Sequence, residues 1–126
     1  MNLPTLPEFD APDLVASIEN LRIEAIHRLP FGAIRLNKDG VVIFYSAREA
    51  QLSGRRSLPT VGLNFFGDVA PCMNNAGFRG RIDAAIALGT LDIEFTHIGD
   101  FEDRNRELRV RALSSSDGGV WLFHQR

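Results

Sequence analysis

The stretch Asn64-Phe-Phe-Gly-Asp-Val-Ala-Pro-Cys72 decides how the rest of the sequence is interpreted. It ends on the only cysteine in the sequence, which directly follows Pro71 and precedes Met73. Two adjacent aromatic residues, Phe65 and Phe66, lie just upstream. Because proline fixes one backbone dihedral, the thiol is held on a stiff backbone beside an apolar wall. A thiol in this setting is well placed to carry a group covalently.

The composition excludes several classes of protein. The sequence has 126 residues and a mass of 14.0 kDa, with 44% hydrophobic and 24% charged residues, as expected for one domain with an ordinary core. A net charge of -2 and a pI of about 5.9 argue against binding to nucleic acid. The N-terminus has no basic segment and the chain has no long apolar run, so we expect neither a signal peptide nor membrane insertion. One cysteine cannot form an internal disulfide, and we therefore expect a cytoplasmic protein.

The first part of the chain predicts a helical cap. The sequence Asp10-Ala-Pro-Asp13 offers an N-cap, with Pro12 early in the first turn. Apolar residues follow at roughly helical spacing, which places Glu19 on the outer side. We expect one helix, or a broken pair, over residues 12–28.

The remaining elements predict an α+β fold. Reading along the chain, we expect a hairpin of Phe31–Leu36 and Val41–Tyr45 about a turn closed by Asp39-Gly40, a short helix capped by Ser46 over Ala47 to about Leu52, a loop that includes Asn64–Cys72, a helix over Phe78–Leu88, and strands over Leu91–Ile98, Glu107–Leu113 and Gly119–His124. A five-stranded antiparallel sheet flanked by helices is the simplest arrangement of these elements. We assign residues 1–28 to an N-terminal helical cap and residues 29–126 to the core of one structural domain.

This order of elements resembles a PAS domain, and the residues resemble the photoactive yellow protein family of bacterial blue-light sensors. The resemblance covers about residues 28–126, and its matching segments are Phe31-Gly-Ala-Ile-Arg-Leu36, Asp39-Gly40, Tyr45, Glu49, Ser53-Gly-Arg55, Gly62–Cys72, Ala112-Leu113 and Trp121. The run from Asn64 to Cys72 is specific, and its spacing from Tyr45, Glu49 and Arg55 strengthens the match.

The resemblance implies a p-coumaric acid joined to Cys72 by a thioester. By position, Tyr45 and Glu49 would hydrogen-bond the phenolic oxygen, Ser53 would support Tyr45, and Arg55 would cover the pocket. The implied apolar lining consists of Ile34, Phe65, Val69, Ala70 and Pro71. The implied partner is a downstream signalling protein, which the sequence does not identify, and we expect a monomer or a weak dimer.

The residue types at these positions suit that chemistry. A buried phenolate needs hydrogen-bond donors, because an unpaired buried charge is strongly unfavourable. Tyr45 is the only tyrosine in the sequence, and its hydroxyl is one such donor. Glu49 can donate only if it is protonated, and we expect burial and a nearby phenolate to raise its pKa. A separation of four residues would place both groups on the same side of one helical turn.

A light response follows from the resemblance as a hypothesis. Light would isomerise the chromophore and pull its phenolate out of the hydrogen bonds. Glu49 would then give up its proton and become a buried, unpaired carboxylate, and the N-terminal cap would loosen to signal. The return to the dark state would be thermal, so we do not expect an enzyme.

Three other interpretations stay open at this point. A PAS module without a chromophore, binding a small ligand or a protein partner, would keep the fold and leave Cys72 unmodified. A thiol enzyme would pair Cys72 with His27 or His97, and a zinc site would add His124, but the paired ligand spacing of zinc sites is missing.

The segment Gly99–Arg106 departs from the family pattern. Relatives commonly carry a methionine there that contacts the chromophore, whereas this chain has Phe101 as its only aromatic residue and no methionine. If the methionine speeds recovery in relatives, dark recovery here should be slow.

Overall fold

A computed structural model describes residues 6–55, 59–89, 91–98 and 105–126. Its strands form one five-stranded sheet in the order β2-β1-β5-β4-β3, and every neighbouring pair is antiparallel. The strands are β1 (Gly32–Leu36), β2 (Val42–Tyr45), β3 (Asp92–Ile98), β4 (Glu107–Ser114) and β5 (Val120–Gln125). The expected α+β fold with a five-stranded antiparallel sheet is confirmed, and the strand bounds lie within a residue or so of those predicted.

The helices also lie close to where the sequence predicted them. They are α1 (Leu14–Glu19), α2 (Ile23–His27), α3 (Ala47–Ser53) and α4 (Arg79–Ala87). The cap is therefore the broken pair of helices rather than one helix. The N-cap residue of α1 is Asp13, within the predicted stretch, but its side chain makes no capping hydrogen bond and Pro12 precedes the helix instead of lying in its first turn. The Asp10 carboxylate pairs with Arg109 of β4 at 2.7 Å.

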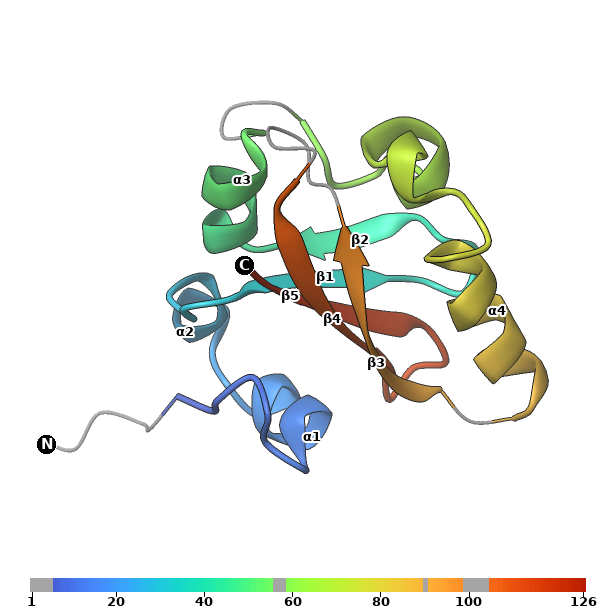
Figure 1. Cartoon of the computed structure of the whole chain (residues 1–126). Helices are drawn as coiled ribbons and strands as arrows, with labels where there is room; N and C mark the ends of the chain where they lie inside the picture. Colours follow the sequence, from blue (N-terminus) through green and yellow to red (C-terminus); the bar gives the residue numbers. More distant parts are fainter. Residues whose placement is uncertain (1–5, 56–58, 90, 99–104) are drawn as a thin grey trace, which may run out of the picture.

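The sheet has a hydrophobic cluster on each face. Alternate residues of a strand point to opposite faces, and β5 shows this clearly: Trp121 and Phe123 pack with α1 and α2, whereas Leu122 packs with α4 and the segment after α3. Figure 1 shows the cap helices on one side of the sheet and α4 on the other. Trp121 and Phe123 are buried, as the sequence predicted.

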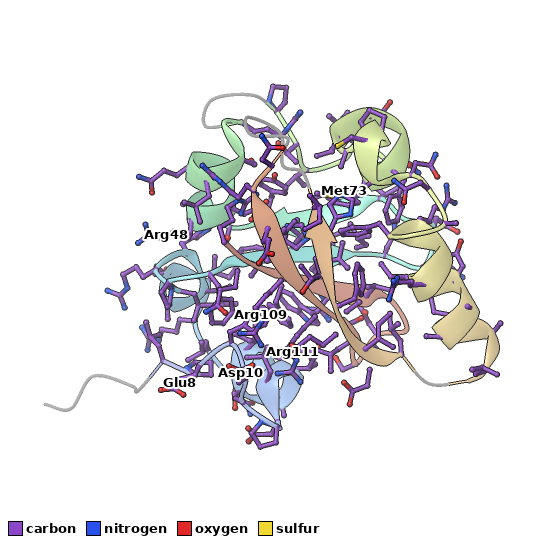
Figure 2. All side chains as sticks on the ribbon, viewed as in Figure 1. Glu8, Asp10, Arg48, Met73, Arg109 and Arg111 are labelled. Carbon is purple, nitrogen blue, oxygen red and sulfur yellow. The ribbon has the colours of Figure 1, made fainter. Side chains whose placement is uncertain are left out.

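Two arginines of β4 hold the start of the cap against the sheet. The buried Arg111 donates from Nη1 to the backbone carbonyls of Phe9, at 2.8 Å, and Ala11, at 2.7 Å. Arg109 pairs with Asp10 and lies over the Phe9 ring, 4.9 Å from its centroid. Figure 2 shows these two arginines beside Asp10. Besides its apolar packing on the sheet, the cap segment is thus held through two backbone carbonyls and one ion pair.

Glu19 makes a second link between cap and sheet. Its Oε1 accepts hydrogen bonds from Trp121 Nε1 at 3.0 Å and from the Ser116 backbone N–H at 3.1 Å, and Arg35 lies 3.4 Å away. The predicted outward position of Glu19 is therefore wrong. Burial raises the pKa of its carboxyl, but the hydrogen bonds from Ser116 and Trp121 and the charge of Arg35 hold that pKa below its usual value.

Local capping fixes α3 on the sheet. The Ser46 hydroxyl accepts from the Glu49 backbone N–H at 3.1 Å, as predicted for an N-cap, and also from the Ala33 backbone N–H of β1 at 3.0 Å. At the other end Gly54 has a φ of 81°, the left-handed conformation in which glycine commonly ends a helix. The first turn of α3, which carries Glu49, is thereby tied to β1.

The segment Asn64–Cys72 is ordered rather than a simple loop. Phe65–Val69 form a π-helical turn, and Pro71–Met73 follow as one 3₁₀ turn. The Asn64 side chain accepts from the Gly67 backbone N–H at 2.8 Å, and the Asp68 carboxylate accepts from the Asn64 backbone N–H at 3.1 Å. These two hydrogen bonds fix the turn, and π-helical turns are frequent at functional sites.

Candidate functional site

Tyr45 and Ser53 form a buried hydroxyl pair. Tyr45 ends β2 opposite Ile34 of β1, and its hydroxyl lies 3.0 Å from Ser53 Oγ at the end of α3. Burial and the negative charge of Glu49 raise the pKa of the Tyr45 phenol. Tyr45 therefore stays neutral and keeps its proton, so it can donate a hydrogen bond when Ser53 donates to it.

Glu49 is completely buried, and its carboxylate contacts two polar side chains. Its Oε1 accepts from Arg126 Nη1 at 2.8 Å, its Oε2 accepts from Arg126 Nη2 at 3.1 Å, and His124 Nδ1 lies 3.3 Å from Oε2. Burial alone would raise the pKa of this carboxyl, but the charges and hydrogen bonds of His124 and Arg126 outweigh burial and lower the pKa. Burial alone therefore does not set the pKa of Glu49, because Arg126 and His124 oppose it, whereas the effect of a nearby phenolate and the state of the carboxylate after illumination stay predictions.

Gly32 makes room for the Glu49 carboxylate against the sheet. It pairs with His124 across β1 and β5, and a β-carbon at this position would lie 1.9 Å from Glu49 Oε1. Real β-carbons do not approach other atoms that closely, so a side chain here would displace the carboxylate. The glycine of the matching sequence Phe31-Gly-Ala is thus part of the site.

His124 and Arg126 are the residues that the sequence interpretation missed. His124 is fully buried, its ring lies 6.0 Å from that of Phe78, and its Nε2 has no hydrogen-bond partner within the described ranges. A signal was present, because His124 and Arg126 are at alternate positions after Leu122, which faces the same core. Two polar residues in an inward-facing register of a central strand indicate a buried polar site.

The opposite wall of the site comes from the segment that ends at Cys72. Four of the predicted lining residues belong to the same buried cluster as Tyr45 and Met73: Ile34, Phe65, Val69 and Ala70. Pro71 and Cys72 are exposed, although the buried neighbours Ala70 and Met73 hold them in place. Figure 2 labels Met73 on this side of the sheet, away from Arg109 and Arg111. The thiol is therefore at the solvent-facing rim of the cluster.

Arg55 lies near the tyrosine end of the site. It follows Gly54 and is half-buried, with Nε donating to Thr60 Oγ1 at 3.1 Å and Nη2 donating to the Pro59 carbonyl at 3.0 Å. Its positive charge acts on the Tyr45 phenol and lowers the pKa of that group, which partly opposes burial. The structure thus brings together Tyr45, Glu49, Ser53 and Arg55.

The three histidines have separate surroundings. His27 Nδ1 accepts from the Ala47 backbone N–H at 2.8 Å and so joins α2 to α3, and the His97 ring packs 5.2 Å from that of Phe78. Within the described part of the chain, no group of three or more His, Cys, Asp or Glu side chains could hold a metal ion. The thiol-enzyme and zinc interpretations gain no support from these positions.

Two further predictions concern parts of the chain other than these site residues. Phe101 and its neighbours in 99–104 lie outside the described residues, so the slow dark recovery stays a prediction. In the described ranges, no helix is both long enough and apolar enough to cross a membrane.

The chain is similar in sequence to curated photoactive yellow proteins. It is 33% identical to that of Halochromatium salexigens, over 94% of this chain and 95% of the relative, and 31% identical to that of Rhodothalassium salexigens, over 94% and 96%. No protein-family model matches the chain.

Solved structures agree with these relatives. The photoactive yellow protein domain of the sensor histidine kinase Ppr from Rhodospirillum centenum is 32% identical, with a TM-score of 0.79 over 88% of this chain and 98% of that domain. A PAS domain of an HTR-like protein from Haloarcula marismortui, at 15% identity and a TM-score of 0.55, supports the fold alone. With the PAS fold and relatives of this identity along nearly its whole length, the chain belongs to the photoactive yellow protein family of sensory photoreceptors.

Proposed function

We propose that this chain is a blue-light photoreceptor that holds p-coumaric acid in a thioester to Cys72, and that it is a sensor rather than an enzyme. The observation that carries the proposal is the arrangement of polar groups around one buried cluster. The Tyr45–Ser53 pair and Glu49 lie on one side of it, and the backbone that bears Cys72 forms the other side. Relatives named photoactive yellow protein support the same interpretation.

The polar groups present fit a phenolic ligand. Ser53 can donate to the Tyr45 oxygen, which leaves the Tyr45 proton for the ligand's phenolic oxygen. Hydrogen bonds to an ionised oxygen are roughly twice as strong as neutral ones, so one neutral, buried phenol is a useful donor there. His124 Nε2, which has no hydrogen-bond partner among the described residues, is a further buried polar atom beside the cluster, while Ile34 and Phe65 supply apolar surface for an aromatic ring.

Cys72 is suited to the attachment because it is exposed. It would supply the sulfur of the thioester by displacing the leaving group of an activated p-coumaroyl donor, and the thiol proton would pass to that leaving group or to solvent. Once bound, the p-coumaroyl group supplies the absorption of blue light and a double bond that isomerises. Pro71 and the buried Met73 on either side of Cys72 restrict the motion of the sulfur.

Glu49 and the cap would provide the response. In the proposal, Glu49 delivers a proton to the phenolic oxygen after illumination, and the N-terminal cap loosens from the sheet. The links that would have to break are those of Glu19 and Arg111. A downstream signalling protein would recognise the change, and the relative within a sensor histidine kinase supports a signalling partner of that kind.

The test compares the wild-type chain with Cys72→Ala after reaction with activated p-coumaric acid. We expect the wild type to become yellow and to gain one p-coumaroyl group by intact mass, and the variant to do neither. Tyr45→Phe should load normally but shift the absorption band, because it loses the donated hydrogen bond. A colourless, unmodified wild type would overturn the proposal and would favour a PAS module that binds a ligand or partner without a chromophore.

A further inference from the structure

Both oxygens of the Glu49 carboxylate are already occupied by one side chain. The Arg126 guanidinium donates Nη1 to Oε1 and Nη2 to Oε2, at 2.8 and 3.1 Å. The Glu49 side chain is 0% exposed and the Arg126 side chain is 6% exposed, so water does not screen the pair. Paired, parallel hydrogen bonds of this kind are the strongest that arginine makes with a carboxylate, and they favour its ionised form.

This pairing conflicts with the role that Glu49 would have toward a phenolic oxygen. To donate a hydrogen bond to an ionised phenol, Glu49 must be protonated, and its hydroxyl must point at the ligand. A guanidinium has only donors, so it cannot accept from that hydroxyl. The Arg126 bond to the protonated oxygen loses its charge assistance, and it breaks where the hydroxyl hydrogen lies on the side that faces the guanidinium.

We propose that Arg126 is the resting counter-ion of Glu49, and that the ligand's phenolic oxygen and the Arg126 guanidinium replace one another as the partner of this carboxyl group. Arg126 and His124 thereby become positioning residues of the site. The proposal rests on the proposed function for the identity of the ligand, but the ion pair itself does not depend on it.

The other groups around Glu49 are compatible with such an exchange. On β5, His124 contacts Oε2; on β2, Tyr45 lies close enough to feel the charge of Glu49; after α3, Arg55 acts on Tyr45 from the exposed side. None of these replaces Arg126, because Arg55 is bonded to Thr60 and to the Pro59 carbonyl, and Tyr45 to Ser53. Without the guanidinium, His124 Nδ1 at 3.3 Å would be the remaining hydrogen-bond partner of the carboxylate among the described side chains.

His124 can follow either state of Glu49 without moving. With its proton on Nδ1, the imidazole donates to Oε2 of the ionised carboxylate, and it can donate to the same oxygen of the neutral carboxyl when Oε1 carries the proton that Glu49 donates to a ligand. Nε2 has no hydrogen-bond partner in the described ranges, so this arrangement breaks no bond there. The edge-on contact with Phe78 keeps the ring in place in both cases.

The exchange has a consequence for the light response. If Glu49 passes its proton to the phenolic oxygen, its carboxylate can return to Arg126 and is not left as an unpaired buried charge. The drive to loosen the cap is then weaker than for an unpaired carboxylate, and the light-adapted form should persist longer. Arg126→Gln should shorten the lifetime of that form.

The first experiment uses the protein before it is loaded with p-coumaric acid. Glutamate side-chain carboxyls are labelled with ¹³C, the Glu49 signal is identified by its loss in Glu49→Gln, and its titration is followed by NMR. We expect the wild-type carboxyl to remain ionised to lower pH than an exposed glutamate. Arg126→Gln should raise its proton affinity at least tenfold, and Arg126→Lys should fall between the two. If Arg126 had a merely structural role, the Glu49 titration would not depend on its charge, whereas a counter-ion makes the titration depend on that charge.

A matched substitution on the neighbouring strand provides the control. Arg109→Gln removes a guanidinium that pairs with Asp10 and Glu94 at the surface, and it should leave the Glu49 titration unchanged. An Arg126→Gln titration equal to the wild type, or a Glu49 that is protonated at neutral pH in the wild type, would overturn the proposal. If Arg126→Gln does not fold, the wild-type and Arg126→Lys titrations still decide it.

The second experiment repeats the NMR measurement on the protein loaded with p-coumaric acid in the dark. We expect Glu49 to be protonated there at a pH at which it is ionised before loading. A carboxyl that stays ionised after loading would overturn the exchange. If Cys72 takes up no p-coumaroyl group, the proposed function fails, whereas the result of the first experiment on the ion pair stands.

Discussion

Trp121 Nε1 donates a hydrogen bond to Glu19 Oε1 at 3.0 Å, which ties the first cap helix to the central strand of the sheet. The residues are 102 positions apart in the sequence, and the same oxygen also accepts from the Ser116 backbone. Glu19 thus accepts hydrogen bonds from the Trp121 indole in β5 and from the Ser116 backbone before it. Loss of this one carboxylate would weaken the contact between cap and sheet at its polar centre.

Glu19→Ala should destabilise the protein by about 1–3 kcal/mol, because it leaves the Trp121 and Ser116 donors without an acceptor. Trp121 is the only tryptophan in the sequence, so its fluorescence during urea unfolding reports on this change directly. Glu24→Ala, at an exposed position in the second cap helix, is the control and should stay within about 0.5 kcal/mol of wild type. Equal effects of the two substitutions would contradict the role assigned to Glu19.

Arg111→Ala should release the start of the cap. It removes both hydrogen bonds to the Phe9 and Ala11 carbonyls, so the segment before α1 should open more often and be cleaved faster by a protease. Limited proteolysis with identification of the cut sites measures this. Arg22→Ala, an exposed cap residue, should leave the cleavage rate unchanged. A cut that moves into the sheet instead would show that Arg111 stabilises the core rather than the cap.

Gly32→Ala should be harmful despite its small size. The added methyl group would lie where Glu49 Oε1 now lies, and overpacking of this kind costs about 1–3 kcal/mol before any loss of the ion pair. Gly80→Ala is the matched control, because in α4 the new methyl group would meet its neighbours at 3.6 Å or more, and a helical alanine is favoured by up to about 1 kcal/mol. Thermal unfolding of both variants should therefore give shifts of opposite sign.

Stability should depend on pH through Glu49 with a defined sign. Its pKa is lowered in the folded state, so Glu49 binds its proton more weakly there than in the unfolded chain. Its contribution is then fully present above the unfolded pKa of about 4.3 and is lost as the pH falls through the lower, folded value. The stability difference between wild type and Glu49→Gln, measured by urea unfolding, should shrink on acidification. A difference that grows toward low pH would mean that the folded pKa is raised.

Arg126→Gln should cost about 3–5 kcal/mol at neutral pH, the usual effect of removing one partner of a buried ion pair. Part of this loss should be recovered in acid, where Glu49 is protonated and no longer needs a cation. The double variant with Glu49→Gln should be more stable at neutral pH than Arg126→Gln alone. Additive losses in this double-mutant cycle would show that the two side chains are not coupled.

Local signals predicted much of the fold. The strands and the Ser46 cap are set by neighbouring residues, and each was found within a residue or so of its predicted place. The order within Asn64–Cys72 was missed because its π-helical turn depends on hydrogen bonds from the Asn64 backbone N–H to Asp68 and from the Gly67 backbone N–H to the Asn64 side chain, which the sequence also permits in an ordinary loop.

The site was predictable only in part. Tyr45 and Ser53 are eight residues apart on consecutive elements, so short-range geometry brings them together. Arg126 is 77 residues from Glu49, and together with His124 it reverses the effect of burial on the pKa of the carboxyl. No local pattern predicts the pairing of Arg126 with Glu49. It arises because β5 lies next to β1, and α3 is hydrogen-bonded to β1 through its N-cap.

The contact of Arg111 with the cap has an evolutionary consequence. Its guanidinium binds two peptide carbonyls, a feature common to every amino acid, so these two hydrogen bonds do not depend on the side chains at positions 9 and 11. The Phe9 side chain is constrained separately, because its ring is buried and lies under Arg109. Arg111 therefore fixes the path of the cap backbone, and cap sequences can vary where their apolar packing on the sheet is kept.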